Sequence, residues 1–123
     1  MAAKILLIED DLFLRDIYTD FLKGENYDVT AAVDGQEGID KIKNGGWDLV
    51  LIDDNLPKLM GVDVLRQARA IQPAPSKKFV FLTNDTEPSD QNDDRLKLSD
   101  AYMVKSEYSP AQLIEALKEF ISV

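Results

Sequence analysis

The feature that most constrains this chain is a repeated switch between short continuous apolar runs and segments whose apolar residues recur at helical spacing. The switch occurs five times within 123 residues, and the predicted strands are residues 4–9, 27–31, 48–53, 78–83 and 100–105. Nearly unbroken aliphatic or aromatic runs are typical of strands covered on both faces, as in a parallel sheet. The alternation therefore predicts an α/β fold, a doubly wound sandwich built as a single domain over residues 1–123.

The segments between these runs indicate amphipathic helices, for example at residues 14–22. Gly24 and Gly45 stand where helices should end, and the Ser-Pro pair at 109–110 supplies an N-cap and a first-turn proline. Residues 87–98, EPSDQNDDRLKL, have one proline, few apolar side chains and several acidic ones. We expect a fourth helix there to be short or frayed.

Composition removes several classes of chemistry. The chain has no cysteine and no histidine, which excludes disulfides, thiolate catalysis, serine-histidine triads and histidine metal ligands. A net charge of −9 argues against nucleic-acid binding by this chain. No apolar run is long enough to span a membrane, and the N-terminus lacks a secretory signal, so we expect a cytoplasmic protein without membrane contact.

Polar side chains gather where the predicted strands end. They are Glu9, Asp10 and Asp11 after the first strand, Asp53, Asp54 and Asn55 after the third, Thr83, Asn84 and Asp85 after the fourth, and Lys105 and Ser106 after the fifth. Ligands of doubly wound folds bind at this edge of the sheet. Converging carboxylates suit a hard divalent cation, Mg²⁺ above all. Any one of these residues could instead be a solvated turn residue or a helix cap, as Asp11 before LFLRDIY could be.

The order and spacing of these motifs resemble the receiver domain of response regulators, the phospho-accepting module of two-component signalling and phosphorelays. The matching features are KILLIEDD at 4–11, DLVLIDDNLPKLMG at 48–61, Thr83, and DAYMVKS at 100–106. The resemblance implies a flavodoxin-like fold, (βα)5, with five parallel strands in the order 2-1-3-4-5. It also implies a bound Mg²⁺ and transfer of a phosphoryl group from a partner phosphohistidine to an aspartate.

The resemblance selects Asp53 rather than Asp54 as the phospho-acceptor. In the family pattern this aspartate lies four residues before the proline of the loop and eight before its glycine, and Pro57 and Gly61 both count back to Asp53. Neighbouring strand residues point to opposite faces, so we expect that Asp53 and Asp54 do not both face one crevice. Asp54 is interpreted as a helix-side or solvated charge at the strand end.

The remaining roles are also implied by the resemblance. Asp10, Asp53 and the backbone carbonyl of Asn55 would bind Mg²⁺, with Glu9 acting through a water molecule. Lys105 would pair with the phosphoryl group, Thr83 would hydrogen-bond to it, and Tyr102 would change rotamer with Thr83; Tyr102 is at the same time expected to be a half-buried strand aromatic. Asn84 and Asp85 would modulate access to the site.

The domain is expected to act as a switch and not as a conventional enzyme, with autocatalytic phosphotransfer and autodephosphorylation only. Its partners would be a sensor histidine kinase or a histidine phosphotransfer protein and a downstream protein, and the chain itself would be a monomer or weak dimer. With no effector segment after Val123, it is either a stand-alone regulator or part of a longer chain.

Three positions depart from the family pattern. Ser106 replaces the usual proline after the lysine, which leaves the Lys105–Ser106 bond cis or trans. Asn84 replaces a small residue, and the polar 87–94 stretch weakens the fourth helix, which belongs to the signalling face in the family.

Two other interpretations stay open. One is a degenerate receiver that binds without phosphorylation, and the other is a phosphatase of haloacid-dehalogenase type, although that class needs an aspartate where Asn55 stands.

Overall fold

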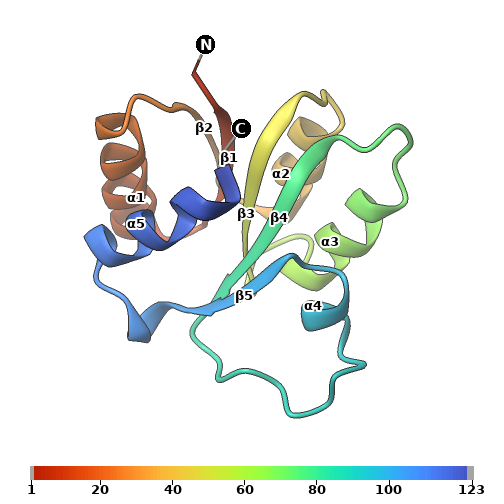
Figure 1. Ribbon diagram of the computed structural model, residues 1–123. Helices are drawn as coiled ribbons and strands as arrows, with labels where there is room; N and C mark the ends of the chain where they lie inside the picture. Colours follow the sequence, from red (N-terminus) through yellow and green to blue (C-terminus); the bar gives the residue numbers. More distant parts are fainter. Residues whose placement is uncertain (1, 122–123) are drawn as a thin grey trace.

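The computed structural model describes residues 2–121, in which five strands and five α-helices alternate along the chain (Figure 1). The strands are β1 (Lys4–Ile8), β2 (Asp28–Ala32), β3 (Trp47–Asp53), β4 (Ser76–Thr83) and β5 (Ala101–Val104). The helices are α1 (Leu12–Gly24), α2 (Gly35–Ile42), α3 (Gly61–Arg69), α4 (Asp94–Lys97) and α5 (Pro110–Ile121), with a 3-10 turn at Lys105–Glu107. All strand pairs are parallel and the order is β2-β1-β3-β4-β5, which confirms the predicted fold and topology.

Helices cover both faces of the sheet, so each strand divides its side chains between two cores. Figure 1 places α1 and α5 on one side and α2, α3 and α4 on the other. Toward α1 and α5 the strands send Ile5, Leu7, Leu49, Leu51, Val80, Leu82 and Met103. Toward α2 and α3 they send Leu6, Ile8, Val50, Ile52, Phe79 and Phe81. The strict alternation follows from the two-residue period of a strand.

The side chains of β1 and of the central strand β3 are almost completely buried. Leu6, Ile8, Val50 and Ile52 have no exposed surface, and their neighbours Leu7 and Leu51 expose 1%. Burying one side chain of this size contributes about 1.5–3 kcal/mol to folding. The carboxyl ends of β1 and β3 are therefore held by a rigid core, and the polar residues that follow them start from fixed positions.

Two of the helices that flank the site begin with side-chain caps. The Asp11 carboxylate accepts a hydrogen bond from the backbone N–H of Leu14 at 3.0 Å, so Asp11 is the N-cap of α1. At α5 the Ser109 hydroxyl accepts from the Gln112 N–H at 3.2 Å, and the Gln112 side chain accepts from the Ser109 N–H at 2.9 Å. This reciprocal pair is a capping box.

The loop after β3 folds back tightly because Gly61 has no side chain. The Gly61 N–H donates to the Asp54 carbonyl at 2.9 Å, and a Cβ at this position would collide with the Asp53 carbonyl oxygen. The backbone approach that lets α3 start here is thus available only to glycine.

The strands differ from their predicted limits by one or two residues at their ends. Asp100 lies just before β5, where its carboxylate accepts from the Phe79 N–H at 2.7 Å, and Lys105 opens the 3-10 turn. Helix α4 has only four residues, which confirms the expected short helix. No helix in residues 2–121 is long and apolar enough to cross a membrane.

The segment from residue 87 to residue 98 should be the most mobile part of the domain. None of its side chains is buried, and several of them are acidic, among them Asp90, Asp93 and Asp94. Because few apolar contacts anchor this segment, its amides should exchange at least about tenfold faster than those of α5. Hydrogen exchange followed by mass spectrometry measures this, and equal protection of the two segments would contradict the expectation.

Candidate functional site

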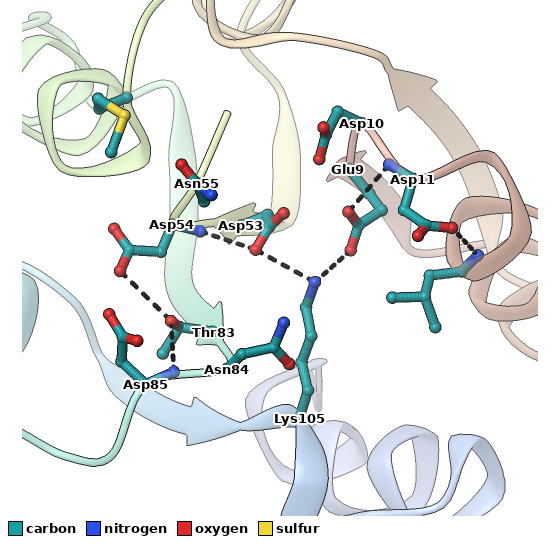
Figure 2. Close-up of a pocket in the computed structure, with 12 residues that line it drawn as sticks. Glu9, Asp10, Asp11, Asp53, Asp54, Asn55, Thr83, Asn84, Asp85 and Lys105 are labelled. Carbon is teal, nitrogen blue, oxygen red and sulfur yellow. Dashed lines mark hydrogen bonds and ion pairs between the residues drawn. The ribbon is translucent and has the colours of Figure 1, made fainter. Parts of the chain in front are cut away.

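A pocket of about 390 Å³ lies at the carboxyl ends of β1, β3, β4 and β5 (Figure 2). Its lining carries six carboxylates and one ammonium group, from Glu9, Asp10, Asp11, Asp53, Asp54, Asp85 and Lys105. Thr83, Asn55 and Asn84 also line it. The structure thus brings together most of the residues that the sequence places at the strand ends.

An ion-pair triad forms the floor of this pocket. The Lys105 ammonium contacts Glu9 Oε1 at 2.6 Å and Asp53 Oδ1 at 3.1 Å. Each of the three residues lies two positions beyond a core residue of its strand that faces α1 and α5, namely Leu7, Leu51 and Met103. Strand alternation therefore sends all three side chains to the same face, where they meet.

The triad is buried, which changes its electrostatics. Glu9 exposes 1% of its surface, and burial raises the pKa of Glu9 to about 7, with Lys105 opposing this shift and Asp53 adding to it. Burial alone would lower the pKa of Lys105, but the adjacent Glu9 and Asp53 carboxylates outweigh it and raise that pKa. Lys105 therefore remains a cation that two carboxylates share.

Two contacts fix one oxygen of the Asp53 carboxylate. Oδ1 accepts from the Asp54 N–H at 2.9 Å in addition to its contact with Lys105. Oδ2 takes part in neither bond. The carboxylate is thus fixed in orientation, as a nucleophile requires.

The donor atoms at one side of the pocket fit a divalent cation. Carboxylate oxygens of Glu9, Asp10 and Asp53 lie within 4.8 Å of one another. When all three carboxyl groups are ionised, Lys105 offsets one of their charges and leaves two uncompensated. An all-oxygen set with that charge suits Mg²⁺, which prefers hard ligands and retains several waters.

The helix-side interpretation of Asp54 is confirmed by its contact with Arg95 of α4. The solvated interpretation is wrong, and so is the expectation that Asp53 and Asp54 do not face one crevice. The Asp54 side chain is only 13% exposed and lines the same pocket as Asp53. Asp54 does point to the opposite face from Asp53, toward α4, as alternation requires. However, β3 ends at Asp53, and beyond the last strand residue both faces open onto one pocket.

Asp54 has two partners on its own side of the sheet. Its Oδ2 accepts from the Thr83 hydroxyl at 3.3 Å and pairs with Arg95 Nη1 of α4 at 3.4 Å. Burial raises the pKa of Asp54, while Arg95 and Thr83 oppose that shift. Figure 2 shows Thr83 directed at Asp54 and the Lys105 ammonium directed at Asp53 and Glu9.

Tyr102 lies beside this second group. Its ring stacks on Phe81 with a centroid distance of 5.8 Å, and the Arg95 guanidinium lies 6.0 Å above the ring. The phenol oxygen lies 3.2 Å from the carbonyl oxygen of Asp85 and 3.3 Å from that of Thr86, and its one hydrogen can be donated to either of them. Tyr102 is half-buried, as expected of a strand aromatic.

The remaining predicted positions stand at the pocket rim. Asn55, Asn84 and Asp85 are exposed and line the opening. The cis peptide bond within residues 2–121 is Gln72–Pro73, so the Lys105–Ser106 bond is trans. Ser106 is accommodated by the 3-10 turn that starts at Lys105.

Comparison with known proteins identifies the family. The model of the response regulator receiver domain matches residues 5–118. The chain belongs to the response regulator receiver domain family. Receiver domains are the phospho-accepting signalling modules of two-component systems, and they are not generally classed as enzymes.

Three relatives illustrate the match. The DNA-binding response regulator MtrA of Mycolicibacterium paratuberculosis is 31% identical over 118 residues, which cover 96% of this chain and 51% of MtrA. A CheY-like receiver domain protein of Methanospirillum hungatei is 30% identical with a TM-score of 0.85, covering 98% of this chain and 94% of that one. The receiver domain of the sensor histidine kinase PA1611 of Pseudomonas aeruginosa has 25% identity and a TM-score of 0.84, with 98% of each chain covered.

Two features of these relatives bear on the site. The structure of the PA1611 receiver domain is described as having a magnesium ion coordinated in its active-site cleft. This receiver domain spans about half the length of the curated relatives that it matches.

Two features of this receiver domain were not predicted from its sequence. One is the contact of Lys105 with Glu9, and the other is the contact of Asp54 with Thr83 and Arg95. The contacts of Asp54 had one signal in the sequence, which is an acidic residue at a position that is more often apolar in the family. Arg95 itself lies in the polar segment for which no specific contact was expected.

Substitution of the shared cation tests the triad. We expect Lys105→Met to lower the free energy of unfolding by about 3 kcal/mol in the presence of a chelator, because it leaves two buried carboxylates without a cation. Urea unfolding followed by the fluorescence of the single tryptophan, Trp47, measures the change.

Lys118→Met is the matched control. Lys118 pairs with Glu25 and Glu115 on the surface, where ion pairs contribute little. Equal losses for the two variants would show that the buried triad has no special role in stability.

Proposed function

We propose that this receiver domain is a phosphorylation-dependent switch that accepts a phosphoryl group from a partner phosphohistidine onto Asp53 in a Mg²⁺-dependent reaction. The observation that carries the proposal is the position of Asp53, whose Oδ1 is fixed by Lys105 and by the Asp54 N–H while Oδ2 remains outside these bonds. Family membership supports the same assignment.

The transfer would be an in-line displacement. A bond forms between Asp53 Oδ2 and phosphorus as the P–N bond to the donor imidazole breaks, and the imidazole leaves with the bonding electrons and takes up a proton. The product on this chain is an acyl phosphate, which water later hydrolyses to inorganic phosphate and the Asp53 carboxylate. The chain contributes mainly position and charge, as is usual for phosphoryl transfer.

The acidic side of the pocket would hold the cation. Asp10, Asp53 and the backbone carbonyl of Asn55 would be its ligands, with Glu9 acting through a water. When bound, Mg²⁺ supplies positive charge that offsets the phosphoryl oxygens. The oxygen atoms of Glu9, Asp10 and Asp53 that lie within 4.8 Å support this assignment.

Other residues would bind the transferred group. Lys105 already lies 3.1 Å from the Asp53 carboxylate, so its ammonium can pair with a phosphoryl oxygen with little movement. Thr83 would donate its hydroxyl hydrogen, and Tyr102 would change rotamer with it. Exposed Asn84 and Asp85 would modulate the approach of donor and water.

The switch would signal through contacts with other proteins. The phosphoryl donor would be a sensor histidine kinase or a histidine phosphotransfer protein. The phosphorylated domain would then bind a downstream protein. A net charge of −9 disfavours direct contact of this chain with nucleic acid. We place the domain in the cytoplasm, where such donors act, as a single unit over residues 1–123.

Mass spectrometry with acetyl phosphate and Mg²⁺ tests the acceptor. The wild-type chain should gain one phosphate, Asp53→Asn should gain none, and Asp54→Asn should still be modified. A chelator should abolish the gain. If Asp54→Asn failed to gain the phosphate and Asp53→Asn still gained it, the acceptor would be Asp54 and the proposed assignment would be wrong.

Asn84 offers a second test, on access to the site. Its side chain is larger than the small residue usual at this position and would screen the phosphoryl site. We expect Asn84→Ala to be phosphorylated about threefold faster by acetyl phosphate, with a smaller change in dephosphorylation. Time courses on both proteins measure the rates. An unchanged or slower phosphorylation of Asn84→Ala would contradict steric screening and favour an amide that orients water.

A further inference from the structure

We propose that Asp54 is a positioning residue that competes with the phosphoryl group for the hydroxyl hydrogen of Thr83. The inference rests on the proposed function, because it assumes that Asp53 carries the phosphoryl group and that Thr83 binds it. It adds a restraint in which the resting state is stabilised by an acidic residue next to the acceptor.

The hydrogen-bonding capacity of Thr83 is the first step. Thr83 is 2% exposed, and its hydroxyl oxygen accepts the Asp85 N–H at 3.0 Å. The hydroxyl donates its single hydrogen to Asp54 Oδ2, and the two oxygen atoms are 3.3 Å apart. A hydroxyl group has only one hydrogen to donate, so Thr83 cannot serve Asp54 and a phosphoryl oxygen at the same time.

The two acceptors lie on opposite sides of the strand end. Asp53 follows the face of β3 that packs on α1 and α5, and its carboxylate contacts Lys105. Asp54 and Thr83 follow the other face, beside α4 (Figure 2). Binding of Thr83 to a phosphoryl group on Asp53 therefore requires the hydroxyl to turn away from Asp54.

Arg95 fixes the competing carboxylate. Its Nη1 contacts Asp54 Oδ2 at 3.4 Å, and its Nε and Nη2 donate to the two oxygens of Asp93 at 3.0 Å each. The Asp54 side chain is 13% exposed and that of Arg95 is 24% exposed. A carboxylate at this depth needs its partners, and once Thr83 turns away the remaining one is Arg95.

The competition links the phosphorylation site to α4. Arg95 belongs to a helix of only four residues, with no buried side chain to hold it in place. Loss of the Thr83 bond leaves Asp54 free to move with Arg95 or toward water. The segment 93–98 is thus the part of the chain that responds when Thr83 changes partner.

A double-mutant cycle tests the competition. The probe is beryllofluoride with Mg²⁺, which binds a carboxylate as a mimic of the phosphoryl group, and its affinity is measured by calorimetry for wild type, Asp54→Ala, Thr83→Val and the double variant. We expect Asp54→Ala to raise the affinity for beryllofluoride both when residue 83 is Thr and when it is Val. The increase should be about tenfold larger with Thr83, because one hydrogen bond to a charged group has about that effect on an affinity. Removal of a negative charge raises the affinity for an anion in both backgrounds, so the ratio isolates the hydroxyl.

The controls separate the alternatives. Asp63→Ala removes an exposed carboxylate of α3 that pairs with Arg66, and it should stay within about twofold of wild type. Thr83→Ser keeps the hydroxyl and should preserve the effect of Asp54→Ala. Asp54→Leu, which has a side chain of similar size and no hydrogen-bond acceptor, replaces Asp54→Ala if that variant fails to fold.

The outcomes distinguish a failure of the competition from a failure of the proposed function. An equal effect of the Asp54 substitution in the Thr83 and Thr83→Val backgrounds would overturn the competition and leave the proposed function intact. Absence of binding to wild type, or binding that persists in Asp53→Asn, would overturn the proposed function and this inference with it.

Amide exchange gives an independent readout. Beryllofluoride should speed exchange at residues 94–98 of the wild type by about threefold or more, because the Asp54 restraint is released. In Asp54→Ala, exchange there should already be fast without the probe and should not change further. A wild-type response that Asp54→Ala retains in full would contradict the link to α4.

Discussion

The site depends on the shared positive charge of Lys105. Its ammonium lies between the buried carboxylates of Glu9 and Asp53, which come from residues far apart in the chain. Parallel strands end at the same edge of the sheet, and the two-residue period sends these three side chains to one face. Without that cation, two desolvated carboxylates would face each other next to a third from Asp10.

The charge balance of the triad explains why the carboxylates at this edge of the sheet would attract a cation. One ammonium offsets only part of the charge of Glu9, Asp10 and Asp53, and burial raises the pKa of Glu9 to about 7. A divalent ion would restore the balance and favour the ionised form of these groups. The same excess of negative charge would oppose an incoming phosphoryl group. The proposed phosphoryl transfer would therefore depend on the proposed binding of the cation.

The opposite face of the strand end carries a second charged group with a different character. Asp54, Thr83 and Arg95 connect the pocket to α4, whereas the triad connects it to β1 and β5. The core strands beneath the triad are rigid because their side chains are fully buried. Helix α4 has little such packing. A change at the pocket therefore meets less resistance on the α4 side, where the polar composition of residues 87–98 disfavours a long helix.

Apolar periodicity, which is a local property of the sequence, predicted the α/β fold, and the family resemblance predicted the strand order. Both also indicated which polar residues follow the strand ends. The sequence also anticipated the short α4 and the cap of α5. It did not determine the partners of Glu9 and Asp54 or the trans bond at Ser106. Alternation placed Asp53 and Asp54 on opposite faces, but only the tertiary structure shows that both faces open onto one pocket past the end of β3. Such contacts depend on where distant strands and α4 stop relative to one another, and no local pattern encodes that.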